Sequence, residues 1–124
     1  MLFRSVLTIE CASSDGRDLK LFGQYKTDKK IGIGVVNHCN TVVEPAEHVA
    51  ALIRKALEYI PKEQLVISTD CGFGREGLSR RIAFYKCAAL VEGTNIVRRE
   101  LGLPEARVRA ADPKLWFAGQ ELLR

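Results

Sequence analysis

The sequence predicts an α/β fold made of three consecutive βα units and a helical tail. Three short runs of β-branched and aliphatic residues are each followed by a segment whose apolar residues have helical spacing. Short connections and right-handed crossovers make such strands parallel, and apolar character on both faces is typical of a sheet covered on both sides. Three strands leave two open sheet edges, so we expect part of a barrel or wound sheet whose remainder is supplied elsewhere.

The first βα unit begins with a strand over Ser5–Ile9, because this run is β-branched and mostly apolar. The strand ends in Glu10, a carboxylate that must be capped by donors or bound to a ligand if it is buried. Residues 13–16 supply helix-capping side chains. A short helix is therefore expected over Asp18–Phe22, closed by Gly23.

The second unit begins with a strand over Ile31–Val36, which runs into residues 37–40. Gly32 and Gly34 would weaken an ordinary strand, so they indicate close packing or a ligand beside the backbone. Proline at the first position and apolar residues at helical spacing then predict an amphipathic helix over Pro45–Tyr59.

The third unit begins with a strand over Leu65–Ile67. A long helix is expected over Leu78–Leu101, with Gly93 interrupting it. The tail, residues 105–124, is expected to contain a last helix that starts at Pro113.

Composition describes an ordinary globular protein with room for one small domain: 47% of the 124 residues are hydrophobic and 27% are charged. Nineteen basic and fifteen acidic residues give a net charge of +4, but the basic residues are spread along the chain, which argues against a nucleic-acid site. No run reaches membrane-spanning length, and the N-terminus does not read as a signal peptide. The four cysteines form no CxxC pair, so we expect reduced thiols and a cytoplasmic protein.

Each predicted strand ends in a potential metal ligand. Glu10 follows the first strand, His38 and Cys39 follow the second, and Cys71 follows the third. The carboxyl ends of parallel strands lie at one face, where sulfur, imidazole and carboxylate together suit zinc. Neighbours on a strand point to opposite faces, so at most one of His38 and Cys39 would face such a site. Taken alone, Cys71 is read more readily as a small core residue than as a site residue.

Six short segments together carry a resemblance to a known family. They are Thr8–Glu10, Ser14–Asp15, Ile31–Gly32, Gly34–Val35, the helix at Pro45, and Asp70–Gly72. In these segments the chain resembles the C-terminal end of the cobalamin-independent methionine synthase (MetE-like) family of zinc methyltransferases, from about Val6 to about Leu101. The resemblance implies that residues 1–124 are a single partial domain, three βα units from the C-terminal part of a TIM barrel.

The resemblance also implies roles for single residues. Glu10 and Cys71, 61 positions apart (10 to 71), correspond to zinc ligands, and substrate contacts fall on Ser14, Asp15 and Asp70. The implied reaction has zinc bind homocysteine as a thiolate, whose sulfur attacks the methyl group of a 5-methyltetrahydropteroyl-glutamate. A cation that lowers the pKa of a thiol yields a strong nucleophile at neutral pH.

Two departures from the family pattern leave alternatives open. At the position of the family's proton-donating histidine this chain has Cys39, with His38 one residue earlier. The family's first two zinc ligands, a His-x-Cys pair, would lie upstream of Glu10, so an upstream barrel segment or another chain is an expected partner. The alternatives are a zinc-dependent thiol alkyltransferase with another donor or acceptor, such as coenzyme M, and a non-catalytic remnant that associates through its open edges.

Overall fold

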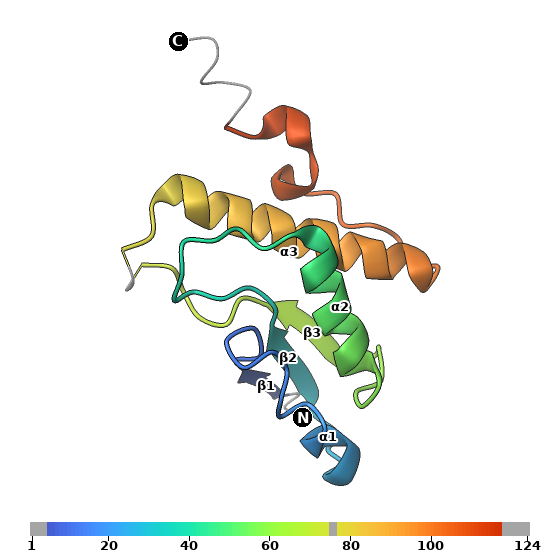
Figure 1. Ribbon diagram of the computed structural model, residues 1–124. Helices are drawn as coiled ribbons and strands as arrows, with labels where there is room; N and C mark the ends of the chain where they lie inside the picture. The colour runs from blue at the N-terminus through green and yellow to red at the C-terminus, as the bar shows by residue number, and fades with distance from the viewer. Residues whose placement is uncertain (1–4, 75–76, 118–124) are drawn as a thin grey trace.

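The computed structural model describes residues 5–74 and 77–117 of the chain, and it confirms the α/β order (Figure 1). The elements are β1 (Val6–Ile9), α1 (Leu21–Gln24), β2 (Lys30–Gly34), α2 (Ala46–Leu57), β3 (Leu65–Ser68), α3 (Arg80–Glu100), and the 3₁₀ turns η1 (Arg109–Ala111) and η2 (Pro113–Leu115). None of the helices in these residues combines the length and the apolar character that crossing a bilayer requires.

The three strands form one parallel sheet in the order β1-β2-β3, as expected. Ile9 pairs with Ile33, and Gly34 pairs with Ser68. Backbone pairing continues past the strand ends, because the Asp70 N–H donates to the Val36 carbonyl at 3.1 Å. The three carboxyl ends, and the loops that follow them, therefore lie at one edge of the sheet.

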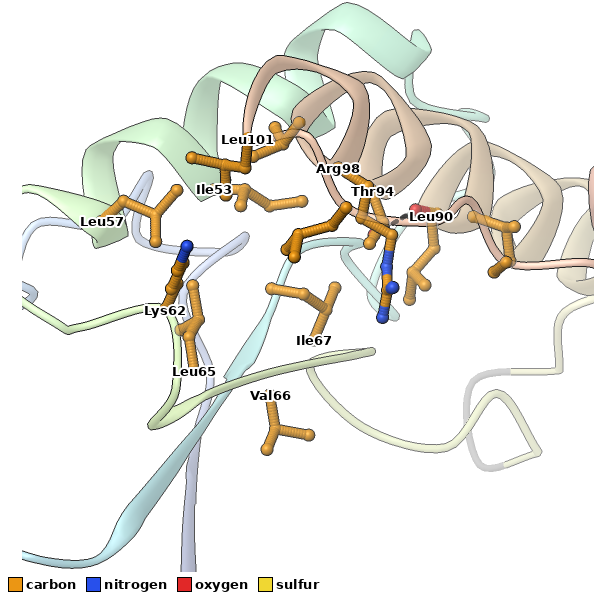
Figure 2. Close-up of a pocket in the computed structure, with 14 residues that line it drawn as sticks. Ile53, Leu57, Lys62, Leu65, Val66, Ile67, Leu90, Thr94, Arg98 and Leu101 are labelled. Carbon is orange, nitrogen blue, oxygen red and sulfur yellow. Dashed lines mark hydrogen bonds between the residues drawn. The ribbon is translucent and has the colours of Figure 1, made fainter.

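One face of the sheet carries the core. Ile31 and Ile33 are almost completely buried and belong to one apolar cluster with the inner face of α2. Strand residues alternate between faces, so Gly32 lies on the opposite face. Figure 2 shows Val66 pointing away from the helices, whereas Ile67 points toward them. In the described part of the chain, α2 and α3 cover only the face of Ile31 and Ile33 (Figure 1), so the expected cover of both faces is present on one.

The two long helices pack against each other at Gly93, where the sequence predicted an interruption. That prediction is wrong, since α3 runs unbroken from Arg80 to Glu100. A Cβ on Gly93 would lie 2.5 Å from the Cβ of Val49 and 2.6 Å from the Ala46 carbonyl oxygen of α2. The missing side chain therefore allows α2 to approach closely, and this packing outweighs the low helix propensity of glycine.

The first connection differs from the predicted helix over residues 18–22. Residues 12–20 form turns, and α1 occupies only Leu21–Gln24. Asp15 and Gly16 have positive φ values of 52° and 65°, and the Gly16 N–H donates to the Cys11 carbonyl at 2.8 Å. This reversal directs the fully buried Leu19 into the core, which leaves no room for a regular helix before it.

The tail also differs from its prediction. Residues 109–117 contain two 3₁₀ turns where the sequence predicted an α-helix from Pro113, and the rest of that predicted helix lies outside the described residues. The Asp112 side chain accepts the Lys114 N–H at 3.0 Å, and the Trp116 indole N–H donates to the Ala110 carbonyl at 3.1 Å. These local bonds satisfy the backbone without a full helical turn.

Candidate metal centre at the strand ends

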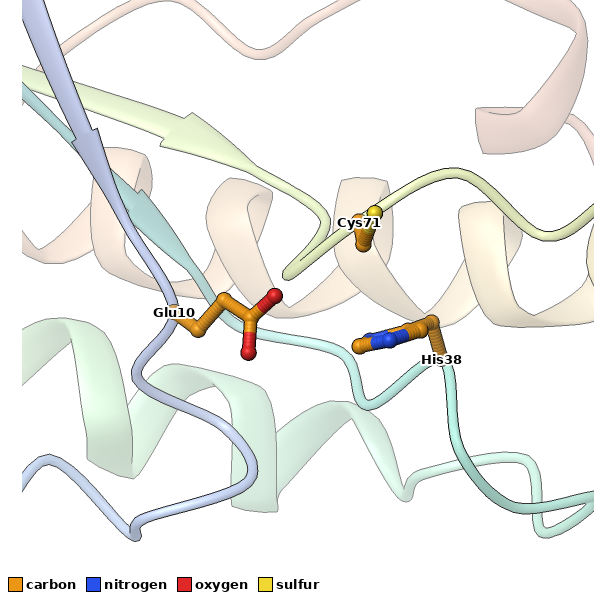
Figure 3. A group of neighbouring side chains, drawn as sticks. All are labelled: Glu10, His38 and Cys71. Carbon is orange, nitrogen blue, oxygen red and sulfur yellow. The ribbon is translucent and has the colours of Figure 1, made fainter. Parts of the chain in front are cut away.

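Three side chains from the three strand ends gather at the edge of the sheet. Glu10 follows β1, His38 lies in the loop after β2, and Cys71 lies in the loop after β3 (Figure 3). One ligand atom of each lies within 4.8 Å of the others. Parallel pairing produces this convergence, because it places residues far apart in sequence at the same end of the sheet.

His38 carries an unusual feature within this cluster. Its ring is half-buried, and its Nδ1 atom is buried with no hydrogen-bond partner among residues 5–74 and 77–117. Its Nε2 atom lies 3.3 Å from the Cys39 Sγ. A buried polar nitrogen without a partner is costly, and it points to a ligand or proton that this position is built to receive.

The donor set of this cluster fits a zinc ion. A carboxylate oxygen, an imidazole nitrogen and a thiolate sulfur are the three donor types found in zinc sites, and catalytic sites combine three protein ligands with one open position. Glu10 and Cys71 are exposed, so the cluster is accessible to a further ligand or a substrate. Glu10, His38 and Cys71 are therefore the residues that could hold the metal.

Asp70 holds the two ends of the cluster in place. Its carboxylate accepts three backbone N–H bonds, from Cys11 (2.9 Å), Ala12 (3.0 Å) and Ser13 (2.8 Å). It thereby ties the turn after Glu10 to the residue before Cys71. A Cβ on Gly34 would lie 2.0 Å from Asp70 Oδ1, so the glycine of β2 provides the space for this carboxylate. Close packing, one of the two reasons predicted for a glycine here, is what the structure shows.

The other predicted site residues lie outside the three-donor cluster. Ser14 donates its hydroxyl to the Cys11 carbonyl at 3.4 Å, and the Asp15 carbonyl accepts the Lys55 ammonium at 2.7 Å. Cys39 is exposed, and His38 takes the place beside Glu10 and Cys71. Substrate contacts at Ser14, Asp15 and Asp70 stay predictions.

Two further cysteines, Cys11 and Cys87, are not among the three clustered donors. Cys11 is 2% exposed and part of the core, and burial, followed by the nearby carboxylates of Asp70 and Asp18, raises its thiol pKa to about 11. Burial also raises the pKa of the half-buried Cys87. Both thiols are held in the protonated form near neutral pH, as expected for core residues.

Sequence reasoning missed Lys86, which is fully buried in α3 and bound to Glu44. A signal was present, because Lys86, Ala89, Gly93 and Val97 recur at helical spacing along the buried stripe of α3. A lysine on such a stripe must have a partner inside the protein.

A separate apolar groove runs along β3 between α2 and α3 (Figure 2). It has a volume of about 370 Å³ and is lined by aliphatic residues such as Ile53, Ile67 and Leu90, with Lys62 and Arg98 at its border. None of the three clustered donors lines it, so the groove and the candidate metal centre are distinct.

Residues 2–92 match the family described as "Cobalamin-independent synthase, Catalytic domain". The chain belongs to this family. The match covers all three strands and the three clustered donors, and it confirms the resemblance stated from the short segments around Glu10 and Cys71.

Relatives of this family include enzymes named methionine synthase. The chain is 48% identical to the one from Saccharolobus solfataricus over 85 residues, which is 68% of this chain and 25% of the relative. It is 44% identical to the one from Thermococcus kodakarensis over 97 residues, which is 78% of this chain and 28% of the relative. The chain thus spans about a quarter of the length of these relatives.

A solved structure of the family has the same fold in the shared part. The B12-independent methionine synthase from Shewanella sp. W3-18-1, in complex with selenomethionine, superposes with a TM-score of 0.70 at 32% identity. The superposition covers 78% of this chain and 27% of that one. The fold that the two chains share is therefore about a quarter of the longer one.

Proposed function

We propose that this chain supplies part of the catalytic centre of a methyltransferase of the methionine synthase type. The reaction would move a methyl group from 5-methyltetrahydropteroyl-glutamate to the thiol of homocysteine. The observation that carries the proposal is the convergence of Glu10, His38 and Cys71 within 4.8 Å, in a chain of the cobalamin-independent synthase family.

In this proposal Glu10 and Cys71 hold zinc. When bound, zinc supplies a positive charge that lowers the pKa of a substrate thiol and yields a thiolate at neutral pH. The carboxylate of Glu10 and the thiolate of Cys71 offset part of that charge. Asp70 keeps these two side chains opposite each other by binding the turn that follows Glu10.

His38 has two possible roles, and both use the unpartnered Nδ1 atom. The Nδ1 lone pair could complete a three-donor zinc site with Glu10 and Cys71. Alternatively, Nδ1 could carry the proton that is donated to the pterin as the methyl group departs. Cys39, at 3.3 Å from Nε2, would orient the ring in either role.

The remaining ligands and most of the substrate pocket would come from the part of the relatives that this chain does not span. Ser14, Asp15 and Asp70 are proposed to border the substrate. An upstream barrel segment, or another chain that supplies it, is the proposed partner.

Zinc binding by the purified 124-residue chain tests the proposal. We expect one zinc per chain by competition with a chromogenic chelator, with affinity reduced at least about tenfold in Cys71→Ser and in Glu10→Gln, because each variant removes a ligand. Cys87→Ser is the matched control, since Cys87 lies on α3 outside the cluster, and it should bind as the wild type does. Binding that is unaffected by Cys71→Ser would contradict the proposal.

A second candidate function is favoured by Cys39 at the position of the family's histidine. It is zinc-dependent alkylation of another thiol, or the use of another methyl donor, in the same site. The two candidates differ in substrate: with the upstream segment added, only the first predicts that homocysteine and the methylated pterin together yield methionine. A non-catalytic segment would bind no zinc through Cys71.

A further inference from the structure

Lys86 is a fully buried lysine that pairs with Glu44 in the interior of the molecule. It is 0% exposed, and its ammonium donates to Asn40 Oδ1 at 3.0 Å, to the Val42 carbonyl, and to both carboxylate oxygens of Glu44 at 3.2 Å. The Glu44 side chain is itself only 11% exposed. Every one of these acceptors lies in the segment between β2 and α2.

The same ion pair reaches the backbone beside His38. Glu44 Oε1 accepts the Asn37 N–H at 2.8 Å, and Asn37 Oδ1 accepts the Cys39 N–H at 2.7 Å. The amides before and after His38 are thus both bonded, one to Glu44 directly and one through Asn37. Residues 35–45 contain no helix or strand, so the side chains of Glu44 and Asn37 accept backbone N–H groups that secondary structure would otherwise pair.

Stability alone gives little reason for such a pair. Burying two charges is costly, and an apolar pair of similar volume is often as stable or more stable. The α2 and α3 helices are already joined by the Gly93 contact and by Arg54, which bridges Glu47 and Glu100 at 2.6 Å on the exposed side. A buried lysine whose acceptors lie in one irregular loop instead fits a role in fixing that loop.

We propose that Lys86 and Glu44 are positioning residues that hold residues 37–42 so that His38 faces Glu10 and Cys71. The inference rests on the proposed function in one respect, which is the role of His38 at the candidate metal centre. The anchor extends from α3 through Glu44 to Asn37, and the His38 ring follows from the position of its backbone. Neither Lys86 nor Glu44 belongs to the cluster of Glu10, His38 and Cys71, so each acts on the cluster through the position of His38.

A pair of double variants separates positioning from stability. Lys86→Met with Glu44→Leu removes both charges and also the acceptor for the Asn37 N–H. Lys86→Met with Glu44→Gln removes both charges but keeps an oxygen acceptor at that position. Arg54→Met is the control, because it breaks an ion pair between α2 and α3 whose partners, Glu47 and Glu100, lie outside residues 37–42. The readouts are amide exchange at Asn37 and Cys39, zinc affinity by chelator competition, and urea unfolding.

We expect the leucine variant to exchange the Asn37 amide at least about tenfold faster and to bind zinc about 10- to 100-fold more weakly, the range found when groups supporting a metal ligand are removed. The glutamine variant should recover most of both, and Arg54→Met should change neither. A leucine variant that folds, protects the Asn37 amide and binds zinc as the wild type does would overturn the inference.

Two further outcomes keep the test decisive. If the leucine variant does not fold, Asn37→Ala replaces it, since the Asn37 side chain is the last link of the anchor and accepts the Cys39 N–H. Unchanged exchange of the Cys39 amide and unchanged zinc affinity in Asn37→Ala would then overturn the inference. If the wild-type chain binds no zinc but the exchange rates change as expected, the proposed function fails and the anchor stands.

Discussion

At the scale of single residues, Asp70 shows how one side chain can organise a site without reacting. Its carboxylate accepts three N–H groups from the turn after Glu10, while its own backbone pairs with β2. Hydrogen bonds to a charged acceptor contribute about 1.5–3 kcal/mol each, net of the bonds to water that they replace. The carboxylate therefore fixes the separation of Glu10 and Cys71, whether or not it also contacts a substrate.

We predict that Asp70→Asn lowers the free energy of unfolding by about 1–3 kcal/mol, because the amide group cannot accept the Ser13 N–H that Oδ2 accepts now. Urea unfolding followed by circular dichroism measures this change. Asp112→Asn is the matched control, since Asp112 accepts one exposed N–H in the tail, and it should change stability by no more than about 0.5 kcal/mol. Equal effects of the two variants would show that the three bonds of Asp70 contribute nothing special.

A second prediction compares the reactivity of the Cys11 and Cys71 thiols. With its pKa raised to about 11 from an ordinary value of 9.0, Cys11 ionises roughly a hundredfold less than an ordinary thiol at pH 8, and it is also buried. Timed alkylation with iodoacetamide, read by peptide mass spectrometry, should modify the exposed Cys71 and leave Cys11 intact. Unfolding in urea should abolish the difference. Labelling of Cys11 as fast as Cys71 in the folded chain would contradict the prediction.

At the scale of elements, the strands and long helices could be predicted because local patterns determine them. Apolar spacing placed α2 and α3 within a few residues of their observed ends. The predicted interruption at Gly93 was wrong because helix propensity does not take account of the packing of α2 against this residue. In the tail, the α-helix predicted from Pro113 was wrong for residues 113–117, because local hydrogen bonds from side chains to the backbone, such as that of Asp112, compete with a helix.

The same limit explains which site residues could be found. Glu10 and Cys71 each follow a strand, so parallel topology predicted their convergence, but the sequence left open whether His38 or Cys39 joins them. Lys86 could not be recognised from its type, because lysine in a helix normally faces water. Only the buried stripe of α3, together with an acceptor on another element, identifies it.

We predict that Gly93→Ala destabilises the fold by about 1–3 kcal/mol, although alanine is the better helix former. The new Cβ would lie 2.5 Å from Val49 and 2.6 Å from the Ala46 carbonyl oxygen, so α2 and α3 must separate. Gly74→Ala is the control, because its added Cβ has no neighbour within 4 Å among the described residues. Thermal unfolding compares the two, and a stabilised Gly93→Ala would mean that helix propensity outweighs the close approach.

At the scale of the whole molecule, one face of the sheet is not covered by helices, and the chain matches only about a quarter of the length of its relatives. We relate these two observations. The helices cover the face of Ile31 and Ile33, while Val66 points away from them and Val6 is 46% exposed. A parallel sheet is normally covered on both faces. The matched part of the chain makes up only 25% and 28% of these relatives, so they have additional chain to supply that cover. We therefore expect the bare face to become the interior of a barrel once the upstream units are present.

We predict that Val66→Glu leaves the isolated chain folded but prevents its association with the upstream units of a relative. Val66 is not packed under the helices, so a carboxylate there stays hydrated in the isolated chain, whereas in a barrel interior it would be buried without a partner. Val108→Glu, at an exposed position before η1, is the control and should associate normally. Size-exclusion chromatography of the mixed segments, with zinc affinity as a second readout, measures association. Since the upstream units would bring the missing ligands, wild type and Val108→Glu should gain zinc affinity on mixing, whereas Val66→Glu should not. If Val66→Glu gains as much zinc affinity as the wild type, this face is not the one that joins the rest of the barrel.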